Sequence, residues 1–124
     1  AYCFYSVPGY SKFGSYVGNA NTNGPYVHLG FSPSFFWTFE DSTSGNFLYD
    51  STRNPNNETA KSVAFPYGPI ADSTSSNYYA DWVANGFKLR TSGTIVNQGS
   101  VFYAFLAFAE HPFGGNNVYP ARAR

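Results

Sequence analysis

The run Val101-Phe-Tyr-Ala-Phe-Leu-Ala-Phe-Ala-Glu110 decides the fold, because it is the longest apolar stretch of the sequence. Aromatic side chains fit the pleated surface of a β-strand, whereas a helix would restrict their rotamers. In a strand, alternate residues point to opposite faces, and both sets of residues in this run are apolar. We therefore expect both faces of the strand to be covered. His111-Pro112 ends it, since proline cannot donate to a strand ladder. The sequence therefore predicts a central strand.

Shorter apolar or alternating segments predict further strands at residues 12–18, 25–31, 34–40, 46–50, 61–65 and 87–90, with a weak strand at 94–96. Asp41–Gly45 predicts a tight connection, and Asn85-Gly86 predicts a two-residue hairpin turn. Residues 70–79 are polar and predict a long surface connection. Amphipathic helices of useful length are missing. We therefore expect an all-β fold, an antiparallel β-sandwich or jelly roll of about eight short strands.

The two ends of the sequence share a short segment of similarity. Ala1–Pro8 can be aligned with Phe105–Pro112, which matches Phe4 to Phe108. Chance similarity of two strand ends is an equally good explanation. If this similarity marks a true repeat of a tandem array, residues 1–9 are the end of a preceding repeat or a linker. Residues 10–113 would then form the sandwich domain and residues 114–124 a C-terminal tail.

Charge and composition limit the partners that the chain can have. Seven basic and seven acidic residues give a formal net charge of zero, which argues against nucleic acid and against an anionic membrane surface. No stretch reaches the length of about 18 apolar residues that a membrane-spanning helix needs. Charged residues make up 11% and aromatic residues 21%, which predicts that part of the surface is covered by copies of the same chain or by other subunits.

Patterns typical of catalysis or cofactor binding are missing, so we predict that the chain is not an enzyme and binds no cofactor. One Cys and two separated His residues do not form a metal cluster, and Cys3 is expected to be a small buried hydrophobic residue. His28 is expected to be an ordinary strand residue. The segments Asp41–Asn46 and Asp72–Asn77 could supply oxygens to calcium, although ordinary loops share their composition.

Four aromatic residues lie in or beside expected loops, namely Tyr67, Tyr78, Tyr79 and Trp82. Such rings can plug the ends of a sandwich or fill a subunit interface. Alternatively they can stack on sugars, which makes them candidate carbohydrate-binding residues. Stacking on nucleic acid would need a cationic groove, and the sequence shows no basic cluster.

Several sequence motifs resemble a repeat found near the C-termini of bacteriophage virion proteins, especially tail and fibre proteins of marine phages. They are Gly9-Tyr-Ser-Lys-Phe-Gly-Ser-Tyr-Val-Gly18, Asn23-Gly-Pro-Tyr-Val27, Gly30-Phe-Ser-Pro33, Leu48-Tyr-Asp-Ser-Thr-Arg-Asn-Pro55, Asn85-Gly-Phe-Lys-Leu-Arg-Thr-Ser92 and Ala107-Phe-Ala-Glu-His-Pro-Phe113. These motifs occur in the order expected from the repeat, from about Ala1 to Phe113. Val7-Pro8 and Phe35-Phe-Trp37 depart from the consensus sequence of the repeat.

This resemblance implies a lectin-like or jelly-roll fold and a place on the surface of a phage particle, after synthesis in the host cytoplasm. It implies a tail-fibre or capsid-decorating structural domain that assembles with copies of itself and with other virion proteins and takes part in host attachment. It carries over no catalytic residue. A carbohydrate-binding module for host surface glycans is the alternative.

Overall fold

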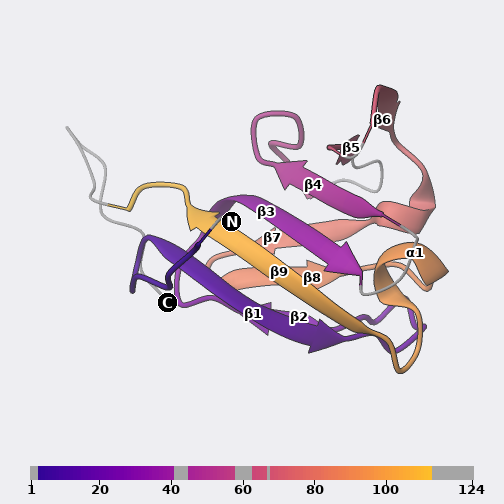
Figure 1. Ribbon diagram of the computed structural model, residues 1–124, viewed down its shortest axis with the longest axis horizontal. Helices are drawn as coiled ribbons and strands as arrows, with labels where there is room; N and C mark the ends of the chain where they lie inside the picture. The colour runs from indigo at the N-terminus through magenta and orange to yellow at the C-terminus, as the bar shows by residue number, and fades with distance from the viewer. Residues whose placement is uncertain (1–2, 41–44, 58–62, 67, 113–124) are drawn as a thin grey trace.

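The computed structural model describes residues 3–40, 45–57, 63–66 and 68–112, and these form two antiparallel sheets (Figure 1). The larger sheet has six strands in the order β1-β9-β3-β4-β5-β6, and the smaller has three in the order β2-β8-β7. The strands are β1 (Ser11–Val17), β2 (Tyr26–His28), β3 (Pro33–Glu40), β4 (Asn46–Asp50), β5 (Val63–Phe65), β6 (Ile70–Ser73), β7 (Ala80–Val83), β8 (Gly86–Leu89) and β9 (Phe102–Ala109). The predicted all-β sandwich is confirmed.

Strand β9 lies in the interior of the larger sheet, between β1 and β3, in agreement with the predicted central strand. It pairs with β1 on one side, where Phe13 is opposite Leu106, and with β3 on the other, where Trp37 is opposite Leu106. Figure 1 looks onto the larger sheet, with β1, β9, β3 and β4 in front and β2, β8 and β7 behind them.

The core lies between the two sheets and is rich in aromatic rings. The ring of Phe36 in β3 stacks on Tyr49 of β4 at a centroid distance of 4.3 Å and on Phe87 of β8 at 4.0 Å. Phe87 and Leu89 are fully buried, in agreement with the predicted alternation of β8. Burial of each such side chain contributes on the order of 1.5–3 kcal/mol. These contacts join the smaller sheet to the larger one.

Two segments differ from the sequence-based expectation. Residues 94–96 were expected to form a weak strand, but Thr94–Asn97 is a single helical turn, α1, after Gly93. The β-branched residues favour a strand locally, and the tertiary contacts of buried Val96 and Asn97 outweigh that preference. The expected connection 70–79 contains strand β6 and a 3₁₀ turn, η1 (Ser76–Tyr78). Three of the four residues of β6 are exposed, so no alternation marks it as a strand.

The hairpin between β7 and β8 forms, but its turn differs from the predicted one. Val83 pairs with Gly86, which leaves Ala84 and Asn85 as the two loop residues. Asn85 does not have the positive φ that a type I′ turn requires. Gly86 is needed for another reason, because a Cβ atom there would lie 2.0 Å from the carbonyl oxygen of Val27. The glycine permits β2 and β8 to approach each other.

The residues before β1 lie against the outer edge of that strand. Val7 and Ser11 form an isolated antiparallel bridge, and the Phe13 backbone N–H donates to Ser6 Oγ at 3.0 Å. Phe4 stacks on Phe13 at a ring distance of 5.1 Å. Cys3 is exposed, so the prediction that it is buried is wrong, because this segment runs along the surface and does not enter the core.

Some predicted features fall outside the described residues. They are the tail 114–124 and most of the connection Asp41–Gly45, of which residues 41–44 are not described. In the described part of the chain, no helix is long and apolar enough to cross a membrane.

Candidate functional site

The aromatic residues predicted to bind sugars do not share one surface. Tyr78 is only 8% exposed, and its ring packs in the core 5.4 Å from that of Phe47. This packing leaves little of the ring free for a ligand. Tyr79 is half-buried and lines a hollow between loops. Tyr67 lies outside the described residues.

Trp82 on β7 is held by structural contacts. Its indole N–H donates to the Asn54 carbonyl oxygen at 2.9 Å, and its ring meets that of Phe36 edge-on at 5.1 Å. The Asn57 side chain accepts from the Trp82 backbone N–H and donates to its carbonyl oxygen, both at 2.7 Å. Trp82 therefore anchors the loop after β4 to the edge of the smaller sheet.

A polar hollow of about 220 Å³ opens where three loops meet, and we call it the loop hollow. Its lining comes from the β1–β2 loop, from the segment around η1 and from the residues after β8. The lining side chains include Thr22, Ser76, Asn77, Tyr79, Arg90 and Ser92. Thr91 also lines it and accepts a hydrogen bond from the Gly93 N–H at 2.8 Å. The hollow thus combines hydroxyl groups, an amide, one guanidinium group and one aromatic ring.

The fully buried side chain of Asn97 holds two of these loops together. Its Nδ2 contacts the carbonyl oxygens of Thr91 at 2.6 Å and of Asn21 at 3.0 Å, and it reaches Asn19 Oδ1 at 3.0 Å. Its Oδ1 accepts from the Asn19 backbone N–H at 2.8 Å. Since a buried amide is costly unless its hydrogen bonds are made, this network fixes the loop conformation.

The larger sheet presents a second candidate surface on the side away from the core, which we call the outer face. It carries Phe13 and Val17 from β1, Phe35, Trp37 and Phe39 from β3, Leu48 from β4, and Phe102, Leu106 and Phe108 from β9, as strand alternation requires. Leu106 is 4% exposed but does not belong to the core cluster. Phe102 is 66% exposed.

Small residues leave a depression in the outer face. Ser15 and Ala104 are opposite each other on β1 and β9, and Phe39 is opposite Ala104 on β3. Together with Phe102 and Glu40 they line a hollow of about 340 Å³. All side chains that β1, β9 and β3 direct to this face by alternation between residues 11–17, 35–39 and 102–108 are uncharged. The face is therefore mainly apolar, and its hollow can accept side chains of a partner.

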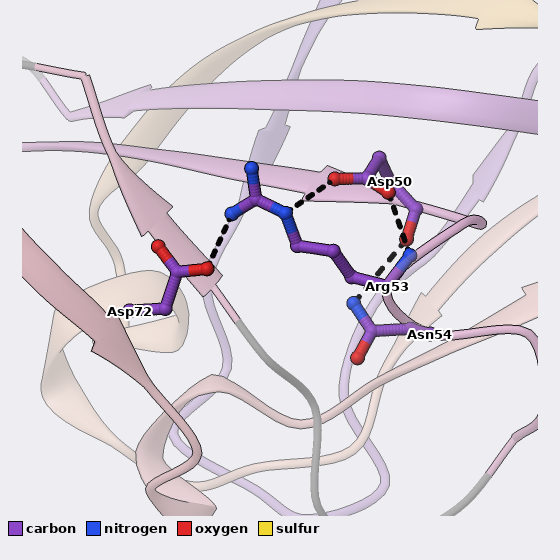
Figure 2. A network of polar contacts seen from close by, with 4 residues as sticks. All are labelled: Asp50, Arg53, Asn54 and Asp72. Carbon is purple, nitrogen blue, oxygen red and sulfur yellow. Dashed lines mark hydrogen bonds and ion pairs between the residues drawn. The ribbon is translucent and has the colours of Figure 1, made fainter.

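The carboxylates near β4 and β6 serve a structural contact. Figure 2 shows the Arg53 guanidinium group between two carboxylates, with Nε 2.9 Å from Asp50 Oδ2 and Nη1 2.6 Å from Asp72 Oδ2. Asn54 Nδ2 donates to the Asp50 carbonyl oxygen at 3.3 Å. Asp72 belongs to one of the two segments considered for calcium, and its carboxylate is bound by arginine here. Among the described residues, no three His, Cys, Asp or Glu side chains gather in a metal-binding arrangement.

His28 takes part in a small surface network, as a polar residue at a strand end can. Its Nδ1 lies 3.2 Å from the Tyr26 hydroxyl, which donates to Asn85 Oδ1 at 2.5 Å. Its backbone carbonyl accepts from Lys12 Nζ at 2.9 Å. The side chain is exposed, and these contacts tie β2 to the β7–β8 turn and to β1.

The sequence could not reveal the residues of the loop hollow as one group. Thr22, Asn77 and Arg90 lie in three separate polar segments, and tertiary contacts, such as the pairing of β7 with β8 and the hydrogen bonds of Asn97, bring these segments together. The one local signal is Tyr79, an aromatic residue beside a polar loop.

A family model described as a domain of unknown function, DUF7483, matches residues 1–112. The match includes both sheets and the residues before β1. No curated protein matches the chain, and no solved structure matches it either.

Proposed function

The chain belongs to the DUF7483 family, and we propose that it is a non-enzymatic structural domain of a bacteriophage virion that assembles with further copies of itself through the outer face. The observation that carries this proposal is the outer face itself. A six-stranded sheet needs cover on both sides if both are apolar, and in the described residues the smaller sheet covers one side only.

The outer face includes exposed apolar residues. Phe102 and the opposite residue Val17 are 66% and 43% exposed, and Phe4 beside Phe13 is 55% exposed. Burial of apolar area is the main driving force of protein association, and aromatic residues are enriched at the centres of interfaces. Binding of a partner to the outer face would remove several aromatic rings from water.

A second copy of the chain is the partner that fits best. The side chains that β1, β9 and β3 direct to the outer face by alternation are uncharged, which limits repulsion between two identical faces. Glu40, the last residue of β3, is the charged residue that lines the hollow of this face. A net charge of zero adds no long-range repulsion between copies. An isologous contact of this kind closes as a two-fold dimer, the commonest symmetric assembly.

The place in a phage particle rests on the resemblance of the sequence to repeats of virion proteins. A tail fibre or a capsid decoration both need stable domains that associate in many copies, and the outer face supplies such a contact. Exposure of the remaining loops at the particle surface would permit host attachment.

Analytical ultracentrifugation of the whole chain tests the assembly. We expect concentration-dependent dimers or larger oligomers for the native chain. Phe102→Lys and Val17→Lys place a charge on exposed positions of the outer face and should yield monomers with an unchanged circular dichroism spectrum. Tyr26→Lys, at an exposed aromatic residue of β2 on the other sheet, is the matched control and should associate like the native chain.

A native chain that stays monomeric at high concentration would contradict the assembly. The same holds if both lysine variants associate as strongly as the control. Immunogold labelling of particles of a phage whose genome encodes the chain tests the location, and particles without label would contradict a virion role.

Recognition of host surface glycans is a second candidate function. The separate observation that favours it is the loop hollow, which lies at the meeting point of three loops and carries Tyr79, one of the predicted sugar-binding residues.

A further inference from the structure

We propose that the loop hollow binds a single sugar unit at the end of a glycan. This proposal gives a location and a ligand size to the second candidate function, and it does not depend on assembly through the outer face. The residues that would contact the sugar are Thr22, Ser76, Asn77, Tyr79, Arg90 and Ser92.

The first argument is the number of polar groups that the hollow leaves without a partner. Within the described part of the chain, the side chains of Thr22, Ser76, Asn77 and Ser92 make no hydrogen bond, and neither does the Tyr79 hydroxyl. A hydroxyl group both donates and accepts, and an amide offers two donors and an acceptor. Such a set matches the hydroxyl groups of a sugar ring, which also donate and accept.

The second argument is the guanidinium group of Arg90. Its Nε lies 3.3 Å from Asp81 Oδ2, and this ion pair limits the positions that the side chain can adopt. Among the described residues, no hydrogen bond engages the terminal nitrogens Nη1 and Nη2. They add donors in a fixed plane, which suits the oxygen atoms of a sugar.

The third argument is the aromatic ring of Tyr79. The C–H groups on one side of a sugar ring form an apolar surface that packs on aromatic rings, while a tyrosine hydroxyl remains free to bond with a polar group. Tyr79 is half-buried beside the hollow, and its carbonyl oxygen accepts from the Arg90 backbone N–H at 2.8 Å. The backbone contact keeps the aromatic and the cationic residue side by side.

The hollow is also formed before a ligand arrives. Asn97 joins the β1–β2 loop to Thr91, and Gly93 lies so close to η1 that a Cβ atom there would be 2.9 Å from the Asn77 carbonyl oxygen. A site held in its binding conformation loses less conformational entropy on binding. These contacts connect all three loops that line the hollow.

Size and chemistry narrow the class of ligand. A volume of about 220 Å³ is below the range of about 300–1,000 Å³ typical of sites for drug-sized molecules, which favours one sugar ring. No carboxylate lines the hollow, so a divalent cation lacks the ligands it prefers. One arginine alone is too little for a nucleic acid backbone.

NMR titration of the whole chain, uniformly labelled with ¹⁵N, tests the proposal. The probes are free galactose, glucose, N-acetylglucosamine and rhamnose, followed by an array of bacterial surface polysaccharides. We expect at least one sugar to shift the amide signals of residues 76–79 and 90–92, while signals of the β2 strand stay in place.

Variants then tie the binding to the hollow. Asn77→Ala changes an exposed side chain, and it should weaken binding at least about tenfold without a change in circular dichroism. Tyr79→Ala should weaken binding by a similar factor. Tyr26→Ala is the matched control, because Tyr26 is an exposed tyrosine outside the hollow, and it should bind like the native chain.

Three outcomes would overturn the proposal. They are the lack of any shift with all probes and array glycans, shifts that fall only outside the hollow, and binding that survives both Asn77→Ala and Tyr79→Ala. Each can occur whether or not the chain associates in the ultracentrifuge, so failure of this proposal and failure of the assembly are distinguishable.

Discussion

Two buried tyrosines of the core show how one hydroxyl group can stabilise a fold and another can oppose it. Tyr16 is 7% exposed, and its hydroxyl donates to the Val96 carbonyl oxygen at 2.9 Å. Tyr49 is 1% exposed, and its hydroxyl is buried without a hydrogen-bond partner. The cost of a buried polar group depends on whether its hydrogen bond is made.

Removal of the two hydroxyl groups should therefore have opposite effects. Tyr16→Phe leaves the Val96 carbonyl unpaired and should lower the free energy of unfolding by about 1–2 kcal/mol. Tyr49→Phe removes only an unpaired group and should raise it by about 1 kcal/mol. Urea unfolding followed by fluorescence measures both, and Tyr5→Phe, at an exposed position, is the control. Loss of stability in Tyr49→Phe would show that its hydroxyl has a partner in solution.

The same burial predicts how stability depends on alkaline pH. Burial raises the pKa of Tyr49 and of Tyr16 well above the ordinary value, because a phenolate cannot be solvated in the core. Above pH of about 10 the unfolded chain releases these protons and the folded chain keeps them, so stability falls as pH rises. Each group contributes a slope of about 1.4 kcal/mol per pH unit.

Urea unfolding at a series of pH values between about 8 and 11 measures this slope. Tyr49→Phe should reduce the slope by the contribution of one group, while Tyr5→Phe should leave the contribution of the buried groups unchanged. Tyrosinate absorbance that rises smoothly for all tyrosines while the fold persists would contradict the prediction.

At the scale of elements, the predictions from sequence were right where burial creates a pattern. Strands β3, β4, β8 and β9 lie in or beside the core, and their apolar runs or alternation locate them closely. Strand β6 is mostly exposed, so no pattern marks it. Helix α1 is set by contacts of Asn97 with distant loops, which a local pattern does not contain.

Gly86 shows how a local signal can be correct for a different reason than the one assumed. The Asn85-Gly86 pair predicts a hairpin through backbone torsion, whereas the structure requires glycine because β2 approaches it closely. Gly86→Ala should therefore separate β2 from β8 and lower the free energy of unfolding by about 3 kcal/mol, at the upper end of what overpacking typically costs.

Gly99→Ala is the matched control, since its Cβ would come no closer than 3.4 Å to another atom and its φ is not positive. Its stability should change by less than about 1 kcal/mol. Thermal unfolding of both variants provides the comparison. A Gly86→Ala variant as stable as Gly99→Ala would mean that the two strands can move apart without loss.

At the scale of the whole molecule, the composition predicts a surface that partners cover, and this stays a prediction. Few charges and many aromatic residues indicate a partly covered surface, and the outer face carries two of the exposed apolar residues, Val17 and Phe102. The candidate sugar-binding residues were selected as aromatic residues near loops. The rings of Tyr78 and Trp82 pack against those of Phe47 and Phe36. Only tertiary structure distinguishes the two uses of a ring.

The mainly apolar character of the outer face predicts how self-association should respond to solution conditions. Contacts between charges weaken as salt screens them, whereas apolar contacts are strengthened by sulfate and weaken on cooling. The oligomer should therefore persist when sodium chloride is raised to about 1 M, grow in sodium sulfate and dissociate partly at about 5 °C relative to 25 °C. Sedimentation velocity under these conditions measures the response, with Phe102→Lys as a monomeric reference. Dissociation of the native oligomer by sodium chloride would assign the contact to surface charges such as Arg53, Asp72 and Arg90, and would remove the outer face as its cause.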